Sequence, residues 1–364
     1  MSAFIRFLFI FISFFLPLNL FPEECPYQKN LKIGLINNNF INYLDYLNYF
    51  LDKFSYEKSI TFEINIIDND NNINEFDITF GDYLDLKKIN KKKIKIPAKL
   101  QKFYNNNNII LSENFFPLDL DTLILLKNEN IEFQSFEELS KYQNKYKYSL
   151  GFNLYNENIF SKLIYYNLDL LNFKFDHIVN ESNIELINKI YLNSNKDLLN
   201  SDYLTLYESF LNSENTINLF EDGILLYRNN QNKNFQLFPK SEYKWSDEKG
   251  IFESQNTTIP SSFYGFSAIL NNEANSGFLC YLTEEEVRIN SFKNFNIQLS
   301  PLSEFEVRSI NEQISLKYLN ILKLKNKNIK AILDNDFELI LGLVTNIKNF
   351  NEILDKDYLN VNFN

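Results

Sequence analysis

Two carboxylates placed two residues apart are the side chains whose spacing most directly suggests chemistry in this sequence. Asp119 and Asp121 occur in the run Phe-Pro-Leu-Asp-Leu-Asp, which leads into an apolar stretch over residues 122–126. Because side chains alternate along an extended chain, both carboxylates are expected on the same side. Ionised carboxylates accept hydrogen bonds from hydroxyl groups and pair with ammonium groups. The pair therefore predicts contacts with a sugar or an amine. The alternative is a purely structural role, in which the two aspartates are solvated loop residues or cap the end of a strand.

The same pair also allows a catalytic hypothesis, in which two carboxylates hydrolyse a glycoside. That chemistry requires one carboxylic acid kept protonated in an apolar pocket, and the sequence does not indicate such a pocket. The chain has one histidine, His177, and no Gly-rich phosphate loop, G-x-S-x-G motif or C-x-x-C motif. We therefore predict no catalytic residues, no metal site and no cofactor. An exported hydrolase that acts on glycans is the alternative.

Six further residues are candidate ligand contacts. Some lie at the ends of predicted strands or at the start of a predicted helix, and others are aromatic residues in or near polar stretches. They are Asn38, Asp82, Asn153, Tyr155, Trp245 and Tyr264. Asn38 stands where free backbone N–H groups can hold a ligand hydroxyl, and helix capping is its alternative role. Trp245 is the only tryptophan. A partly exposed indole stacks on sugars or on cations, and packing inside a lobe is the alternative.

Alternating strand and helix patterns must position these side chains. Runs typical of buried strands cover residues 31–36, 61–67 and 76–80, and apolar residues recur at helical spacing over residues 40–54. This order predicts a parallel sheet covered by helices. The alternation begins again at residues 148–152. We therefore expect an α/β protein of two lobes, each a mostly parallel sheet flanked by helices, with the carboxyl ends of the strands facing one cleft.

Three parts of the chain carry a family likeness. Segment 75–82, Glu-Phe-Asp-Ile-Thr-Phe-Gly-Asp, is similar to a strand end that lines a ligand cleft. Segment 116–128, Phe-Pro-Leu-Asp-Leu-Asp-Thr-Leu-Ile-Leu-Leu-Lys-Asn, with segment 133–139 behind it, is similar to a crossover between lobes. Segment 259–262, followed by 268–283, is similar to the return strand and the helix after it. Together they resemble the extracellular solute-binding proteins of ABC importers, the large group with sugar-binding and polyamine-binding members.

This resemblance implies a periplasmic-binding-protein-like fold with two lobes joined by a hinge. It places the N-terminal lobe in residues 28–120 and 262–310, the C-terminal lobe in residues 121–261, and further helices that pack on the lobes in residues 311–364. The implied function is to capture a small solute, a sugar first and a polyamine second, and to deliver it to the membrane permease of an ABC importer. We expect a monomer. The family's Gly-rich patches are largely missing, since the chain has 8 Gly residues, so individual ligand positions stay open.

The N-terminal segment indicates export. Residues 7–21 are almost wholly apolar and follow a single basic residue, Arg6. That length suits the apolar region of a signal peptide and is short for a membrane span. We therefore expect a signal peptide over residues 1–22 and a periplasmic or otherwise extracytoplasmic protein. No A-x-A-like cleavage site follows, and Pro-Glu-Glu precedes Cys25 in place of the small residue of a lipoprotein site, so a retained anchor is the alternative.

Charge and cysteine content complete the picture. The net charge is −11 and the sequence pI is near 4.9, which argues against nucleic-acid binding because that function requires positive surface. Two cysteines, Cys25 and Cys280, are present. In an exported protein they could form a disulfide; alternatively, Cys280 belongs to the core and Cys25 stays unpaired.

Overall fold

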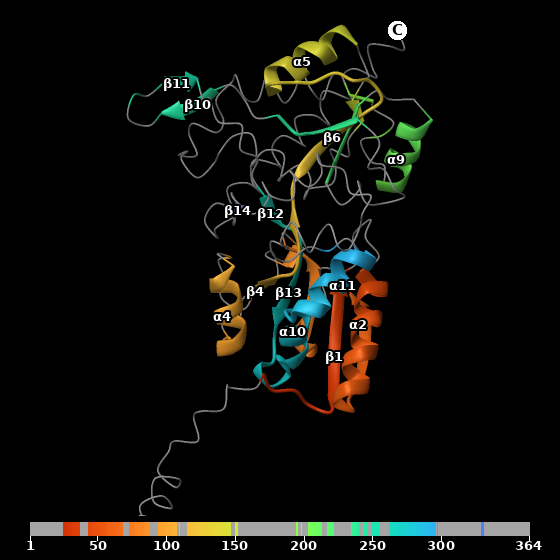
Figure 1. The fold of residues 1–364 in the computed structure, drawn as a ribbon, viewed down its shortest axis with the longest axis vertical. Coiled ribbons are helices and arrows are strands. Elements are labelled where there is room, and N and C mark those ends of the chain that lie inside the picture. The colour runs from red at the N-terminus through yellow and green to blue at the C-terminus, as the bar shows by residue number, and fades with distance from the viewer. Residues whose placement is uncertain are drawn as a thin grey trace, which may run out of the picture.

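The structure is a computed structural model that describes residues 25–36, 43–67, 73–83, 85–86, 94–107, 109, 115–146, 150–151, 194–195, 198, 203–212, 217–221, 234–239, 243–246, 249, 251–254, 262–295, 297 and 329–330. These residues form two lobes, one above the other in Figure 1, with short strands between them. Within those ranges, each helix is too short or too polar to span a lipid bilayer.

The lower lobe in Figure 1 is built on a five-stranded sheet with the order β2-β1-β3-β13-β4. Its strands are β1 (Asn30–Ile36), β2 (Thr61–Ile67), β3 (Ile78–Asp82), β4 (Phe115–Pro117) and β13 (Phe266–Leu270). β1 pairs in parallel with β2 and β3, whereas β13 runs antiparallel to β3 and β4. Every residue of β3 and β13 is buried, which explains why both sequences consist of apolar and small residues up to Asp82 at the end of β3.

Helices cover this sheet and close its core. They are α2 (Tyr43–Lys58), α4 (Ala98–Asn106), α10 (Gly277–Leu282) and α11 (Glu285–Phe295), with short 3-10 turns at Ile73–Glu75 and Glu273–Asn275. The buried residues of α2 recur three and four positions apart, which gives the helix one apolar face. That face meets the sheet at Phe266, whose ring stacks on Tyr43 at a centroid distance of 3.8 Å and lies 5.8 Å from the ring of Phe80.

The upper lobe contains a four-stranded sheet with the order β7-β8-β6-β9. Its strands are β6 (Leu123–Lys127), β7 (Leu150–Gly151), β8 (Ile217–Glu221) and β9 (Asn234–Leu237). β6 is antiparallel to both β8 and β9, and β7 is parallel to β8. The helices α5 (Phe136–Lys145) and α9 (Tyr203–Leu211) and the antiparallel hairpin of β10 (Tyr243–Ser246) and β11 (Ile251–Ser254) belong to this half of the structure (Figure 1).

A buried lysine ties the end of β6 to β9. Lys127 is 1% exposed, and its Nζ donates to the carbonyl of Ile131 and to Gln236 Oε1, the latter at 2.7 Å. Glu132 adds an ion pair at 3.5 Å. Gln236 also accepts from the Phe133 N–H at 3.0 Å and donates to the Phe133 carbonyl at 2.9 Å. The charge is therefore buried together with several acceptors, as a buried ammonium group requires.

The predicted fold of two α/β lobes is confirmed. In each sheet most strands run in the same direction and one strand is reversed, β13 in the lower lobe and β6 in the upper lobe. The return strand β13 comes back from the upper lobe, so it runs opposite to β3 beside it. In the upper lobe, β6 is the strand that arrives from the lower lobe. It enters the sheet between β8 and β9 and runs antiparallel to both.

The C-terminal part of the chain contributes one strand that the sequence did not predict. Ile329 and Lys330 form a short strand, β14, parallel to β12 (Ser262–Tyr264). Together with β5 (Leu120–Asp121), they make a three-stranded sheet with the order β14-β12-β5. A third segment of the chain thus reaches the region between the lobes. The predicted helices of residues 311–364 otherwise lie outside the described residues.

Candidate functional site

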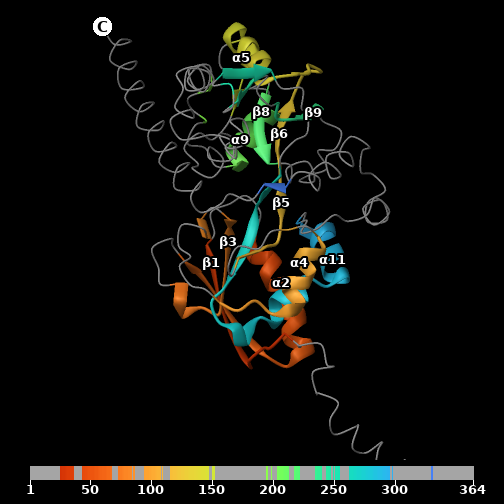
Figure 2. The ribbon, with the colours of Figure 1, turned by 90° about the vertical axis from the view of Figure 1, so that its left-hand side faces the viewer.

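The two segments that connect the lobes define the candidate site. The outgoing segment contains β4, β5 and β6, and the return segment contains β12 and β13. Figure 2 shows both passing through the middle of the molecule, with β5 between the two lobes. β5 and β12 pair antiparallel with Phe263 opposite Asp121 and Tyr264 opposite Leu120. We refer to residues 115–123 and 262–268 as the crossing.

Gly265 is the point where the crossing is most closely held. Its N–H donates to the Asp119 carbonyl at 3.1 Å, and its carbonyl accepts from the Tyr83 N–H at 2.9 Å and from Ser267 Oγ at 3.0 Å. The next residue, Phe266, accepts at its carbonyl from the N–H groups of Leu118 and Asp119 at 2.8 and 2.9 Å. The return strand is therefore bonded to the outgoing segment and to the end of β3 at the same place.

The three predicted site aspartates come from the chain segments that adjoin this point. Asp82 is the register partner of Phe266, Asp119 accepts the Leu120 N–H at its own Oδ1 at 2.9 Å, and the carboxylate of Asp121 packs directly on Gly265. The three residues are between 2% and 5% exposed. Because an isolated carboxylate is costly to bury, these side chains must be held by the further interactions that each of them makes.

Two aromatic residues lie with these carboxylates. Tyr264 was predicted from the sequence, and it is buried with its ring 5.2 Å from that of Tyr83. Tyr83 in turn contacts Phe115 of β4 at a centroid distance of 5.6 Å. The two tyrosines therefore pack across the crossing and join the end of β3 to both connecting segments.

The negative charge of Asp119 also affects the pKa of a tyrosine in the core of the lower lobe. Burial raises the pKa of the Tyr46 hydroxyl well above its ordinary value, and the negative charge of Asp119 raises it further. A hydrogen bond from Ser291 Oγ at 3.5 Å opposes this rise. Tyr46 therefore stays neutral.

The remaining predicted site residues are not brought into this cluster by the described part of the chain. Trp245 lies on β10 opposite Phe252 of β11, and Figure 1 shows that hairpin apart from β12; its side chain is outside the described residues. Asn38, Asn153 and Tyr155 also lie outside them. These four remain predictions. Among the described residues, acidic, histidine and cysteine side chains nowhere form a group of three that could hold a metal ion.

Sequence reasoning missed Gly265 and Tyr83, which bond to each other through their backbones. Tyr83 directly follows the predicted Asp82, so extending the strand end by one residue would have found it. Gly265 stands alone between two aromatic residues in the return strand, and an isolated glycine in a strand often marks a close backbone approach. That signal was present, but its partner was not identifiable from the sequence.

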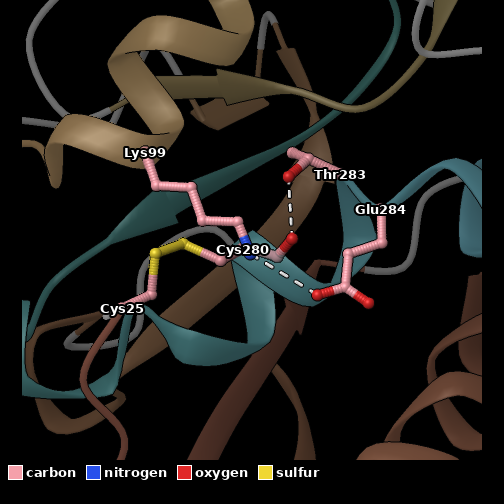
Figure 3. Close-up of a disulfide and its surroundings, with 5 residues drawn as sticks. All are labelled: Cys25, Lys99, Cys280, Thr283 and Glu284. Carbon is pink, nitrogen blue, oxygen red and sulfur yellow. Dashed lines mark hydrogen bonds and ion pairs between the residues drawn. A yellow bond between two sulfur atoms is a disulfide. The ribbon is translucent and has the colours of Figure 1, made fainter. Parts of the chain in front are cut away.

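The described residues also line a cavity of about 730 Å³, which lies at the end of the lower lobe away from the crossing. Its walls come from α2, α4, α10 and the N-terminal residues, and a disulfide between Cys25 and Cys280 lies on its surface (Figure 3). Lys99 of α4 forms an ion pair with Glu284 at 3.5 Å, and Thr283 Oγ1 donates to the Cys280 carbonyl at 2.7 Å. The disulfide, one of the two alternatives that the sequence left open, is therefore present, far along the sheet from the crossing.

Comparison with known proteins identifies the fold. No protein-family model matches the sequence, and no curated protein matches it. A cyclic alpha-maltosyl-1,6-maltose binding protein from Arthrobacter globiformis is similar in structure, with a TM-score of 0.57, 10% identity, and coverage of 87% of this chain and 92% of that one. A ferric ion-binding protein A from Pasteurella haemolytica gives a TM-score of 0.55 at 13% identity, covering 88% and 98% of the two chains.

An enzyme shares the same architecture. Thiaminase I from Clostridium botulinum, in complex with thiamin, gives a TM-score of 0.62 at 13% identity and covers 88% of this chain and 99% of its own. Several other similar structures are named as binding proteins or solute receptors. The chain therefore has the two-lobed fold of periplasmic solute-binding proteins, and at these identities the likeness establishes the fold alone.

Proposed function

We propose that the protein is an extracytoplasmic solute-binding protein that captures a small solute between its lobes and delivers it to the permease of an ABC importer. The observation that carries this proposal is the crossing, where aspartates and tyrosines from the end of β3 and from both connecting segments gather at the link between the lobes. A ligand that contacts both lobes favours the closed form and turns binding into a change of shape that a permease can recognise. The proposed lobes comprise residues 28–120 with 262–310, and residues 121–261.

The proposed ligand is a sugar, with a polyamine second. Carboxylates accept hydrogen bonds from sugar hydroxyls and pair with ammonium groups, and aromatic rings stack on sugars and on cations. A maltose-type sugar is bound by one protein of this fold, as its name states, which supports the first choice. We expect a dissociation constant near ~1 µM, or about −8 kcal/mol, which suits a carrier that must release its ligand.

The proposed export of the protein is supported by the Cys25–Cys280 disulfide, because disulfides persist in oxidising compartments outside the cytoplasm. The apolar segment over residues 7–21 supplies the export signal. A monomer with no cofactor is the simplest form of such a carrier.

The experiment is a thermal-shift screen of the full chain against sugars, polyamines and amino acids. A ligand that binds the folded state raises the melting temperature in proportion to its occupancy. A rise with one sugar class or one polyamine, reproduced by calorimetry with a one-to-one stoichiometry, supports the proposal. The absence of any stabilisation across the three classes sinks it, and turnover of a chromogenic glycoside would instead support the hydrolase alternative.

The role of Asp121 is resolved by the substitution Asp121→Asn, which keeps the shape of the side chain and removes its charge. If Asp121 contacts the ligand, the variant loses affinity by about tenfold or more, since hydrogen bonds to charged groups contribute roughly 1.5–3 kcal/mol. If it only holds the crossing together, the unliganded protein loses stability and the affinity stays the same. Asp52→Asn, at an exposed position on α2, is the matched control for the loss of one negative charge.

A further inference from the structure

The disulfide between Cys25 and Cys280 forms part of the wall of the cavity in the lower lobe (Figure 3). Two small residues, Ala98 of α4 and Gly277 of α10, also line this cavity, so part of its wall lacks long side chains. Its volume of about 730 Å³ lies within the range of cavities that hold small molecules. A small molecule that enters the cavity therefore reaches the bridge.

The two cysteines of the bridge differ in exposure. Cys280 lies in α10, is 2% exposed and belongs to the hydrophobic core. Cys25 is only partly buried, and it packs against that core from outside. A thiolate opens a disulfide by attacking one of its two sulfur atoms, and access is one of the factors that decide which one it attacks. The sulfur of Cys25 is therefore the expected point of attack, and the sulfur of Cys280 is the expected leaving group.

We propose that Cys25 is a site of reversible thiolation, at which a small thiol enters the cavity and exchanges with the bridge while the protein stays folded. The thiol reacts as its thiolate, which forms a new bond to the sulfur of Cys25, and the bond between Cys25 and Cys280 breaks. The electron pair of the broken bond stays on the sulfur of Cys280, and this thiolate then takes a proton from water. One disulfide replaces another, so the step requires no further oxidant or reductant.

Contacts other than the disulfide hold the modified cysteine in place after the exchange. The Gly277 N–H donates to the Pro26 carbonyl at 2.7 Å, and the Gln28 N–H donates to Asn275 Oδ1 at 2.7 Å. The segment that carries the added group therefore stays against the start of α10, close to the thiol of Cys280. Because the two groups remain neighbours, their effective concentration is high. The Cys280 thiolate should therefore expel the small thiol and restore the bridge once the free thiol is removed.

The test treats the full chain with a mixture of cysteine and cystine in the absence of denaturant, stops the exchange with acid and locates the products by peptide mass spectrometry. We expect one added cysteinyl group on Cys25 and a free thiol at Cys280. We also expect the original bridge to return when the mixture is removed by dialysis. An added group on Cys280 in place of Cys25 would overturn the proposal, and so would the absence of any adduct.

The dependence of the exchange rate on urea shows whether the reaction occurs in the folded protein. A reaction that requires global unfolding becomes faster as urea lowers the free energy of unfolding, whereas direct attack through the cavity does not. We expect the rate to be independent of urea below the unfolding transition. A rate that follows the unfolding equilibrium would show that the native protein protects the bridge, and the proposal would then be wrong.

Access through the cavity is tested by Ala98→Phe, compared with Gln101→Phe. Both residues are exposed on α4, and of the two it is Ala98 that lines the cavity. The ring added by Ala98→Phe should obstruct the cavity and slow the exchange by about tenfold, equivalent to about 1.4 kcal/mol on the barrier. Gln101→Phe should leave the rate unchanged, and equal rates in the two variants would contradict entry through the cavity. These measurements use no ligand at the crossing, so their outcome is independent of the proposed solute binding.

Discussion

The carboxylate of Asp121 occupies the space that a Cβ atom on residue 265 would fill. This contact joins the outgoing and return segments directly beside the place where β5 and β12 pair. The absence of a side chain at Gly265 is therefore a condition for the close packing of the crossing. The relation between these two residues leads to the first prediction.

Gly265→Ala is expected to destabilise the protein by about 1–3 kcal/mol, because the added methyl group overpacks a buried contact. Gly81→Ala is the matched control in β3, where the nearest atom to the added Cβ is Ile36 Cβ at 3.1 Å, and it should cost less. Urea denaturation measures both. Combining Gly265→Ala with Asp121→Ala should recover part of the loss, since the second change removes the clashing carboxylate. Strictly additive effects would contradict a direct contact.

Whether a feature of this site could be predicted from the sequence depends on how far apart in the chain the contacting residues lie. The strand end at Asp82 and the Asp119–Asp121 pair were predicted from local patterns, and they lie together in the structure. Their burial was not predictable, because it results from Gly265 and Phe266, which approach from a distant part of the chain. The pairing of Cys25 with Cys280 was left open for the same reason.

The hydrogen bonds at helix ends were also only partly predictable, although their partners are close in the sequence. Ser135 and Glu138 have the spacing of a capping box, and Ser135 Oγ accepts the Glu138 N–H at 3.2 Å at the start of α5. Thr283 and Glu286 have the same spacing, yet Thr283 Oγ1 donates back to the Cys280 carbonyl and ends α10. A hydroxyl group can bond forward or backward along the chain, and the choice here follows from the short preceding helix that packs at the disulfide.

The second prediction concerns the disulfide itself. Replacing both cysteines in Cys25→Ser/Cys280→Ser should lower the free energy of unfolding by about 2–5 kcal/mol, because the bridge closes a long loop in the unfolded chain. A reductant should destabilise the native protein by a similar amount and should leave the double variant unchanged. Equal stability of the native protein with and without reductant would show that the bridge contributes nothing. Guanidinium denaturation under both conditions provides the measurement.

The third prediction concerns the buried Lys127, for which removing an acceptor should cost more stability than removing the charge itself. Gln236→Leu removes a close acceptor of the Lys127 ammonium group and leaves the charge buried, so it should cost about 3–5 kcal/mol. Lys127→Met removes the charge and keeps the side-chain volume, while Gln236 retains both bonds to Phe133, so it should cost less. A double-mutant cycle should show strong coupling between the two positions. A larger loss for Lys127→Met would reverse this assignment.

The fourth prediction concerns alkaline pH and follows from Tyr281 on α10. Burial raises the pKa of this tyrosine to about 12, and the charges of Glu57 and Glu284 add to the rise. Its ordinary value is about 10. Between those two values the unfolded chain loses this proton and the folded chain keeps it, so the free energy of unfolding falls as the pH rises through the window. Below about pH 10 the contribution to stability is fully present.

Tyr281→Phe should therefore make the loss of stability between about pH 10 and 12 less steep. The slope should not vanish, because burial raises the pKa of Tyr46 and Tyr104 in the same direction. Glu284→Gln keeps the hydroxyl and removes one neighbouring charge, so it should lower the upper end of the window, while the lower end, set by the unfolded chain, stays the same. Urea midpoints measured across this pH range distinguish these results. If Tyr281→Phe and the native protein give the same slope, the hydroxyl of Tyr281 is not held neutral by the packing of α10 against α2 and α4.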